Sequence, residues 1–242
     1  MMSNSEKIAY AKANMAGLLG LADNAFDRSE NIFVESERMM FWISTFGNNA
    51  VIVGRDDVIN WCVERFAHMS AQEILEANST FRIDAHLRGL GYRLHSLDVR
   101  YLHLYPETAV EMPPGLEYKR MLGAEAVQFI KEHPLDAVFR ENFDDLCECS
   151  PLYAAFDGDK AVCLVGGGGD DKGMWPIGRI DTLPGYRNRG IARYLTKRLA
   201  NELEAEGKVA YYTAWATNLA SARLALSVGF VPAWVGTYAE RI

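Results

Sequence analysis

The chain of 242 residues is 49% hydrophobic and 24% charged, which is ordinary for a globular protein with a sizeable core, either one large domain or two small ones. Its formal charge of -7 argues against broad nucleic-acid binding, which needs many lysines and arginines to neutralise phosphates. No apolar run approaches the roughly 20 residues of a membrane-spanning helix, and the polar start lacks a secretion signal. We therefore expect a cytoplasmic protein without nucleic-acid or membrane partners, and the sequence leaves a homodimer open.

The first hundred residues alternate helix-like and strand-like segments, which predicts a small α/β region. The pattern indicates helices near 6–22, 57–67 and 71–89, strands near 32–35 and 49–53, and a strand or hairpin over 92–105. The turn Pro113-Pro114-Gly115 favours a linker over 108–115. We therefore expect an N-terminal region, residues 1–110, before a second domain, residues 111–242.

The second domain reads as an α+β arrangement. We expect a strand over 116–121, a helix over 124–132, and two strands over 152–156 and 161–165 joined by a hairpin turn at Asp157–Lys160. The glycines Gly166–Gly169 suggest a nucleotide loop, but another strand follows them instead of a helix, which favours a flexible turn near the acceptor entrance. A strand over 177–182 comes next.

The stretch Thr182–Leu195 runs from that strand through a basic turn into a helix. The first amide groups of a helix lack carbonyl partners and carry partial positive charge, so an anion binds well there. Arg187 and Arg189 add full charges, and Gly190 removes the Cβ that would keep a bulky diphosphate away from the main chain. Ala192, two positions later, is also small, as close approach of a diphosphate to the main chain requires. The stretch therefore predicts a phosphate-binding loop.

A helix over 190–206 is predicted after the loop, with Gly207 as its end. Arg193 and Lys197 extend the expected basic patch along it. Its apolar residues share one face: Ile191, Tyr194, Leu195, Leu199 and Leu203.

A strand over 209–215 and a second helix over 218–228 follow. Thr217 or Asn218 is the expected cap of this helix, and Gly229 ends it before a final strand over 230–235. Its apolar face is predicted to consist of Leu219, Ala222 and Leu226.

The hexapeptide Arg187–Ala192 resembles the [Arg/Gln]-x-x-Gly-x-[Gly/Ala] loop with which the GNAT superfamily of N-acetyltransferases binds acyl-CoA pyrophosphate. A second pattern of that family, Asn-x-x-[Ala/Ser]-x-x-Leu-x-x-x-x-Gly-Phe, is similar to Asn218, Ser221, Leu224, Gly229 and Phe230. The first motif alone is more often an ordinary helix start, but two motifs in order and in register are specific. The resemblance covers roughly 116–242. It implies a mixed, mostly antiparallel sheet flanked by helices.

The resemblance also implies acetyl-CoA as cosubstrate, and no metal. The pantetheine arm would run along Ile180 and Thr182, where the strand splays from its neighbour and frees backbone amides to polarise the thioester carbonyl. Asn218 would hold the cofactor arm, a role compatible with helix capping. The diphosphate would lie on Arg187, Asn188, Arg189, Gly190, Ile191 and Ala192.

The implied reaction moves an acetyl group to the amine of a small molecule. The amine would attack the thioester directly in a ternary complex. The acidic balance favours a cationic acceptor. Asp181, beside the thioester strand, and Glu148, across the expected acceptor cleft, are the candidate bases, although each has an ordinary role as a solvated or ion-paired carboxylate, and ordered water is an alternative. Many family members carry a general-acid tyrosine where this chain has Ala225.

Two alternatives stay open beside this enzyme. The missing tyrosine favours a catalytically inactive, acyl-CoA-binding regulatory module, and the N-terminal region is compatible with a degenerate acetyltransferase half that walls the acceptor pocket. The pair Cys147 and Cys149 lacks companion metal ligands, so core or edge thiols are the better interpretation. The extra region before the domain resembles bacterial acetyltransferases of the zwittermicin-resistance type.

Overall fold

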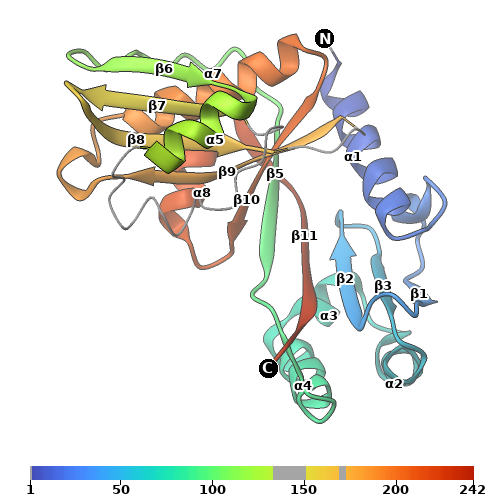
Figure 1. Cartoon of the computed structure of the whole chain (residues 1–242). Helices are drawn as coiled ribbons and strands as arrows, with labels where there is room; N and C mark the ends of the chain where they lie inside the picture. Colours follow the sequence, from blue (N-terminus) through green and yellow to red (C-terminus); the bar gives the residue numbers. More distant parts are fainter. Residues whose placement is uncertain (1, 133–150, 169–172) are drawn as a thin grey trace. The chain divides into compact units, whose positions relative to one another are not determined.

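A computed structural model describes residues 2–132, 151–168 and 173–242 and divides the chain into two compact units (Figure 1). The first unit comprises Met1–Lys7, Tyr101–Thr213 and Leu219–Val231. The second comprises Ile8–Arg100, Ala214–Asn218 and Pro232–Ile242. The units interleave along the chain, since its last strand begins in the first unit and ends in the second. The division expected at residue 110 remains a prediction.

The first unit is built on an open sheet with the strand order β5-β10-β9-β8-β7-β6. The pairs β6–β7, β7–β8 and β8–β9 are antiparallel, and β9–β10 is parallel. This mixed, mostly antiparallel sheet with flanking helices confirms the predicted fold class. Its elements are β5 (Asp98–His103), β6 (Glu117–Met121), α5 (Gly123–Glu132), β7 (Leu152–Asp157), β8 (Lys160–Gly167), β9 (Met174–Thr182), η2 (Pro184–Tyr186), α7 (Ile191–Ala205), β10 (Val209–Trp215) and α8 (Leu219–Ser227).

Helices cover both faces of this sheet at β7. The Phe129 ring of α5 packs edge-on against Phe156 of β7 at 5.7 Å between centroids. Tyr153, three positions before Phe156, points to the opposite face, where its hydroxyl donates to Glu202 of α7. The expected apolar stripe of α7 is confirmed, because Ile191, Leu195, Leu199 and Leu203 are buried and α7 lies against β7, β8 and β9.

The second unit carries a smaller sheet with the order β1-β3-β2-β11, and β4 also pairs with β11. One apolar cluster joins β2 and β3 to α2, α3 and α4, and another joins β3 to the end of α1 and to η1. These clusters confirm an α/β arrangement. The elements are α1 (Asn4–Leu18), η1 (Ala25–Asp27), β1 (Ile32–Glu35), β2 (Phe41–Thr45), β3 (Ala50–Gly54), α2 (Asp56–Phe66), α3 (Ala71–Leu75), α4 (Ala77–Arg88), β4 (Tyr92–Leu94) and β11 (Phe230–Arg241).

Four details of the sequence prediction were wrong. Strand β2 was not predicted. The single helix over 71–89 is two helices, because Glu76 between them has the extended backbone angles φ -72° and ψ 159°. Within 92–105 the structure bears out the strand alternative, with strands β4 and β5, and only the hairpin alternative is wrong, since β4 pairs with β11 through partners such as Arg93 and Glu240. Gly166 and Gly167 belong to β8 instead of a turn, and a Cβ on Gly167 would lie 3.2 Å from the Pro176 carbonyl oxygen.

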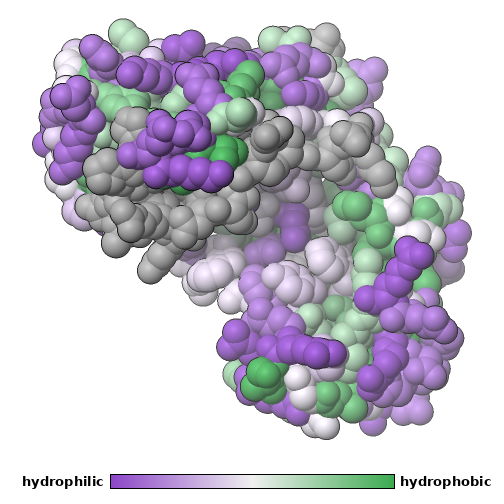
Figure 2. Space-filling view, in the orientation of Figure 1, coloured by the Kyte–Doolittle hydropathy of each residue, from purple (hydrophilic) through white to green (hydrophobic). Residues whose placement is uncertain are grey.

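Hydrophilic residues cover much of the face drawn in Figure 2, with hydrophobic residues in separate groups between them. None of the helices in the described parts of the chain is both long and apolar enough to cross a bilayer. Cys62 and Cys163 are buried free thiols, and burial raises the pKa of each to about 12. Both are core thiols; Cys147 and Cys149, for which core or edge thiols were predicted, lie outside the described residues.

Candidate functional site

The predicted phosphate loop joins β9 to α7 and is open to solvent, with Arg187, Asn188, Arg189 and Gly190 all exposed. Gly190 is the N-cap residue of α7 and has φ 80°, a left-handed conformation that a Cβ disfavours. Asn188 has φ 61°, which asparagine tolerates better than most residues. Because glycine offers no side-chain cap, the first amides of α7 keep their capacity to bind an anion.

The two residues after Gly190 fix this turn to the core. Ile191 is only 2% exposed, and Ala192 is half-buried. The apolar side chain of Ile191 therefore anchors the first turn of α7, while its main chain starts the helix at the surface. Of the predicted cofactor residues 187–192, residues 187–190 thus form a solvent-exposed loop, and Ile191 and Ala192 form the start of α7.

A cavity of about 530 Å³ opens at this loop. Arg189, Gly190 and Arg193 line one side, and the segment Ala109–Pro114 lines the other. A Cβ built on Gly190 would meet the Pro113 Cγ at 3.7 Å. The volume lies within the usual range of small-ligand sites, and the guanidinium groups and helix amides suit an anionic group. The residues present therefore fit the diphosphate of an acyl-CoA.

The strand before the loop also contributes polar groups. The Nε of Arg187 donates to the Thr182 carbonyl oxygen at 2.9 Å, and its Nη2 lies 3.8 Å from Asp181 Oδ1. Asp181 Oδ1 also accepts from the Thr182 amide at 2.8 Å. The Thr182 hydroxyl turns inward and donates to Cys163 Sγ at 3.1 Å, so its side chain faces the core, while its main-chain amide and carbonyl are engaged by Asp181 and Arg187.

The pairing of β9 with β10 stops before β9 ends. It covers Met174–Ile177 against Val209–Tyr212, and β9 continues beyond it through Gly178–Thr182, which includes Ile180. A β-bulge at Arg179, with φ 51°, shifts the register against β8 in the same stretch. This interruption is what the resemblance implies for the strand that carries the pantetheine arm.

The expected basic patch along α7 is wrong for Lys197. This side chain is buried, and its Nζ donates to the Pro106 carbonyl oxygen at 2.7 Å. Arg193 stays at the surface, but its guanidinium donates to Ser227 O at 3.2 Å and to Ala109 O at 3.3 Å. The basic residues exposed in the loop itself are Arg187 and Arg189.

The catalytic residues remain predictions. Asp181 is the second-last residue of β9 and forms an ion pair with Arg187, which is the ordinary role of such a carboxylate, and Glu148 lies outside the described residues. Ala225 stands in the position of the usual tyrosine and is fully buried, and an alanine has no hydroxyl that could act as an acid. The buried Tyr212 hydroxyl is hydrogen-bonded to Ser221 Oγ at 2.7 Å.

The second predicted motif lies on α8 and its ends. Asn218 belongs to the second unit, and its amide donates to Trp215 O at 2.9 Å in the turn before the helix. Gly229 ends α8 with φ 97°, as predicted. The predicted apolar face is wrong, because Leu219 and Leu226 are 60% and 53% exposed, and Ala225 is the buried residue of this helix.

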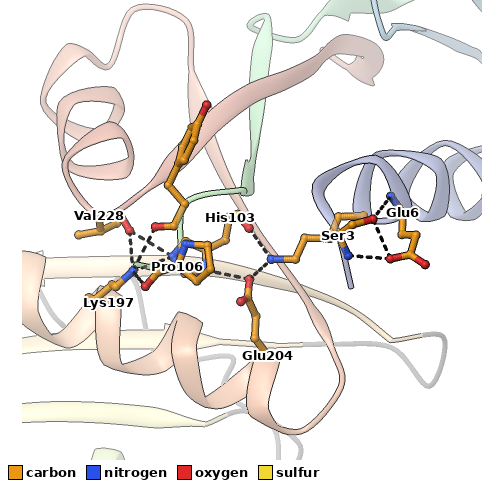
Figure 3. Close-up of polar contacts among 9 residues, drawn as sticks. Ser3, Glu6, His103, Pro106, Lys197, Glu204 and Val228 are labelled. Atoms are coloured by element: carbon orange, nitrogen blue, oxygen red, sulfur yellow. Dashed lines mark hydrogen bonds and ion pairs between the residues drawn. The ribbon is translucent and has the colours of Figure 1, made fainter. Parts of the chain in front are cut away.

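A buried polar network behind the loop was not predicted (Figure 3). Lys7 Nζ donates to Glu204 Oε1 at 2.5 Å and to the His103 carbonyl oxygen at 2.7 Å. His103 Nδ1 lies 2.8 Å from Glu204 Oε1, and its Nε2 lies 3.1 Å from Lys197 Nζ. Because a carboxylate accepts, His103 Nδ1 donates to Glu204, whereas its Nε2 lies 3.1 Å from a donor, Lys197 Nζ, and 3.1 Å from an acceptor, the Val228 carbonyl oxygen.

The network shifts the pKa values of two of its members, Glu204 and Lys197. Burial opposes the charged form of Glu204, but the hydrogen bonds from His103 and Lys7 outweigh it, so the pKa of this carboxyl lies below its usual value. Burial lowers the pKa of Lys197. One signal in the sequence could have predicted this burial. Lys197 and Glu204 lie three residues before and four residues after the buried Ala200, which places them on the same face of α7.

Comparisons with known proteins give one family match and several similar structures. The model of the acetyltransferase (GNAT) family matches residues 118–230. No match was found among curated proteins. Solved structures similar to the chain include a GNAT-family protein from Novosphingobium aromaticivorans (20% identity, 63% of this chain and 68% of that one, TM-score 0.47).

Two further similar structures are GCN5-related N-acetyltransferases. The one from Kribbella flavida has 17% identity, covers 64% of this chain and 62% of its own length, and has a TM-score of 0.45. The one from Sphaerobacter thermophilus has 18% identity, covers 69% and 57%, and has a TM-score of 0.47. The chain thus spans less than two thirds of the length of these two proteins. Over residues 118–230, which include the predicted phosphate loop and α8, the chain is therefore identified as similar to the acetyltransferase (GNAT) family.

Proposed function

We propose that the protein is an acyl-CoA-dependent N-acetyltransferase that moves an acetyl group from acetyl-CoA to the amine of a small molecule. The observation that carries the proposal is the loop before α7, where a left-handed Gly190 and two exposed arginines surround uncapped helix amides. The family match over the same segment supports acetyl transfer. The net charge of -7 favours a cationic acceptor. The narrower likeness to the zwittermicin-resistance type stays a prediction.

Each part of the site has a physical task in this reaction. The amides of α7 with Arg187 and Arg189 hold the diphosphate, which fixes the position of the acyl group relative to the sheet. The part of β9 beyond its pairing with β10 offers main-chain groups to the pantetheine arm and, at the thioester, to the carbonyl oxygen that becomes negative.

The acceptor nitrogen attacks the thioester carbonyl carbon directly, the new C–N bond forms, and the C–S bond breaks to release a thiolate. The nitrogen loses its proton to a base, for which Asp181 and Glu148 stand as candidates beside ordered water. A buried Ala225 supplies no acid to the thiolate. Because a thiol with a pKa of roughly 8.5 leaves tolerably as a thiolate, the reaction does not require that acid.

The test measures thiol release from acetyl-CoA with a panel of primary amines, together with the affinity for CoA by calorimetry. Amine-dependent thiol release supports the enzyme. Saturable binding of CoA without release across the panel favours the regulatory module, the second candidate, which the buried Ala225 supports. A wild-type protein that binds neither acetyl-CoA nor CoA contradicts both.

A further inference from the structure

The segment Tyr105–Pro114, here called the strap, has no helix or strand, yet it is fastened along α7. Lys197 Nζ donates to the carbonyl oxygens of Pro106 at 2.7 Å and Tyr105 at 3.4 Å (Figure 3). One turn earlier on the helix, Arg193 Nη2 donates to Ala109 O at 3.3 Å. A segment predicted to be a linker is therefore held by side chains of the helix that begins at the phosphate loop.

A third attachment lies near the far end of the strap. The Tyr118 hydroxyl donates to Pro113 O at 2.9 Å, and the Tyr118 ring packs edge-on against Tyr194 of α7 at 4.8 Å between centroids. Lys197 and Arg193 of α7 thus secure the strap directly at two points, and Tyr118, whose ring packs on α7, secures it at a third. A loop fixed so often along its length has little freedom left to move away from the helix.

The same two basic side chains also hold the end of α8. Arg193 Nε donates to Ser227 O at 3.2 Å, and Lys197 Nζ donates to Val228 O at 3.3 Å. Cations at a helix C-terminus satisfy carbonyl groups that have no partner within the helix. Gly229 allows the strap to come close, since a Cβ there would lie 2.1 Å from the Tyr105 carbonyl oxygen. Arg193 and Lys197 therefore join three segments that are distant in sequence.

This attachment decides the shape of the cavity at the phosphate loop. Ala109–Pro114 form one wall, and Arg189, Gly190 and Arg193 form the other. Lys197 does not line the cavity, because it lies buried behind the strap. We propose that Arg193 and Lys197 are positioning residues, which hold the strap as the second wall of the pocket for the phosphate end of acyl-CoA. This inference rests on the proposed function.

The test compares Lys197→Met and Arg193→Met with wild type by three measurements. Hydrogen–deuterium exchange of residues 105–114 reports whether the strap is released. Calorimetry gives the dissociation constant of CoA. The KM for acetyl-CoA is compared with that for S-acetylpantetheine, which lacks the phosphates and cannot touch the strap pocket. Arg223→Met, an exposed cation of α8, is the matched control.

We expect faster exchange of the strap and a dissociation constant for CoA raised about tenfold in both variants, equivalent to about 1.4 kcal/mol. The KM for S-acetylpantetheine should stay within about twofold of wild type, whereas a general loss of structure would raise both values. The Arg223→Met control should match wild type throughout. Because Lys197 does not line the cavity, its variant separates release of the strap from simple loss of a charge beside the phosphates.

Two results would overturn the inference. Unchanged exchange in both variants means that these side chains do not hold the strap, and faster exchange with unchanged CoA affinity means that the strap is no wall of the site. Should Lys197→Met not fold, Arg193→Lys decides the question by the same measurements, because it keeps the positive charge beside the cavity but removes the guanidinium that donates to both Ala109 O and Ser227 O. If wild type binds CoA and the variants bind it equally well, this inference fails and the proposed function stands.

Discussion

The most direct perturbation of the site is a large side chain at Gly190. This residue has φ 80°, and the Pro113 Cγ lies 3.7 Å from the position of a Cβ, so the indole of Gly190→Trp would fill the cavity beside the helix amides. Gly207, at the other end of α7, has nearly the same φ of 78° and no atom within 4 Å of a Cβ. Gly207→Trp is therefore a matched control for backbone strain.

Both variants should lose about 1–2 kcal/mol of stability, because each places a side chain in the left-handed region. Only the wild type and Gly207→Trp should gain stability from acetyl-CoA. At 100 times the dissociation constant the gain is about 2.7 kcal/mol, which corresponds to roughly 5–11 °C in melting temperature for a chain of this size. Thermal unfolding with and without acetyl-CoA measures this difference directly.

If Gly190→Trp kept the full shift in melting temperature with acetyl-CoA, the diphosphate would lie elsewhere, and its placement at Gly190 would be wrong. Equal loss of the shift in both variants would also contradict it, because strain alone would then explain the effect. A loss confined to Gly190→Trp is the expected outcome.

Three further predictions test the network, the pocket and the core. Glu204→Gln should lower the free energy of unfolding by about 3 kcal/mol at pH 7, because it leaves the buried ammonium of Lys7 without its counter-charge. Since the folded pKa of Glu204 lies below its ordinary 4.5, the difference from wild type should be full above pH 4.5 and fade as pH falls below that value in a urea-unfolding series. The exposed Glu206→Gln control should stay within about 0.5 kcal/mol of wild type. Glu111→Gln removes a negative charge from the lining of the cavity and should tighten CoA binding on the order of twofold by calorimetry, an effect that weakens with added salt; weaker binding would contradict the placement of the phosphates there. Leu199→Ala, fully buried in α7, should destabilise the protein by about 2–5 kcal/mol in thermal or urea unfolding, and a cost below 1 kcal/mol would mean that α7 does not pack on the sheet as described.

The phosphate loop and its helix could be predicted because their determinants are local. Gly190 and Gly207 bound α7 through left-handed backbone angles, and the spacing of Leu195 and Leu199 marks the buried stripe. The hairpin of β7 and β8 could also be predicted from the sequence, because its turn lies between two strands that follow each other in the chain.

Other features depend on partners far away in the chain. The pairing of β4 with β11 joins Arg93 to Glu240, and no local pattern around residue 93 indicates such a neighbour. The buried face of α8 contains Ala225 instead of Leu219 and Leu226, because burial is set by what packs against a helix and not by its hydrophobicity alone.

By itself, the sequence determined the position of the glycine-containing turn before α7, the length of α7 and the family resemblance, since these follow from backbone angles, helical spacing and short motifs. Only the tertiary structure decided that Lys7, His103 and Glu204 meet in a buried network and that the strap forms a wall of the pocket at Gly190. The physical reason is that burial and hydrogen bonding between distant segments depend on the whole arrangement of the chain, which no single stretch of residues encodes.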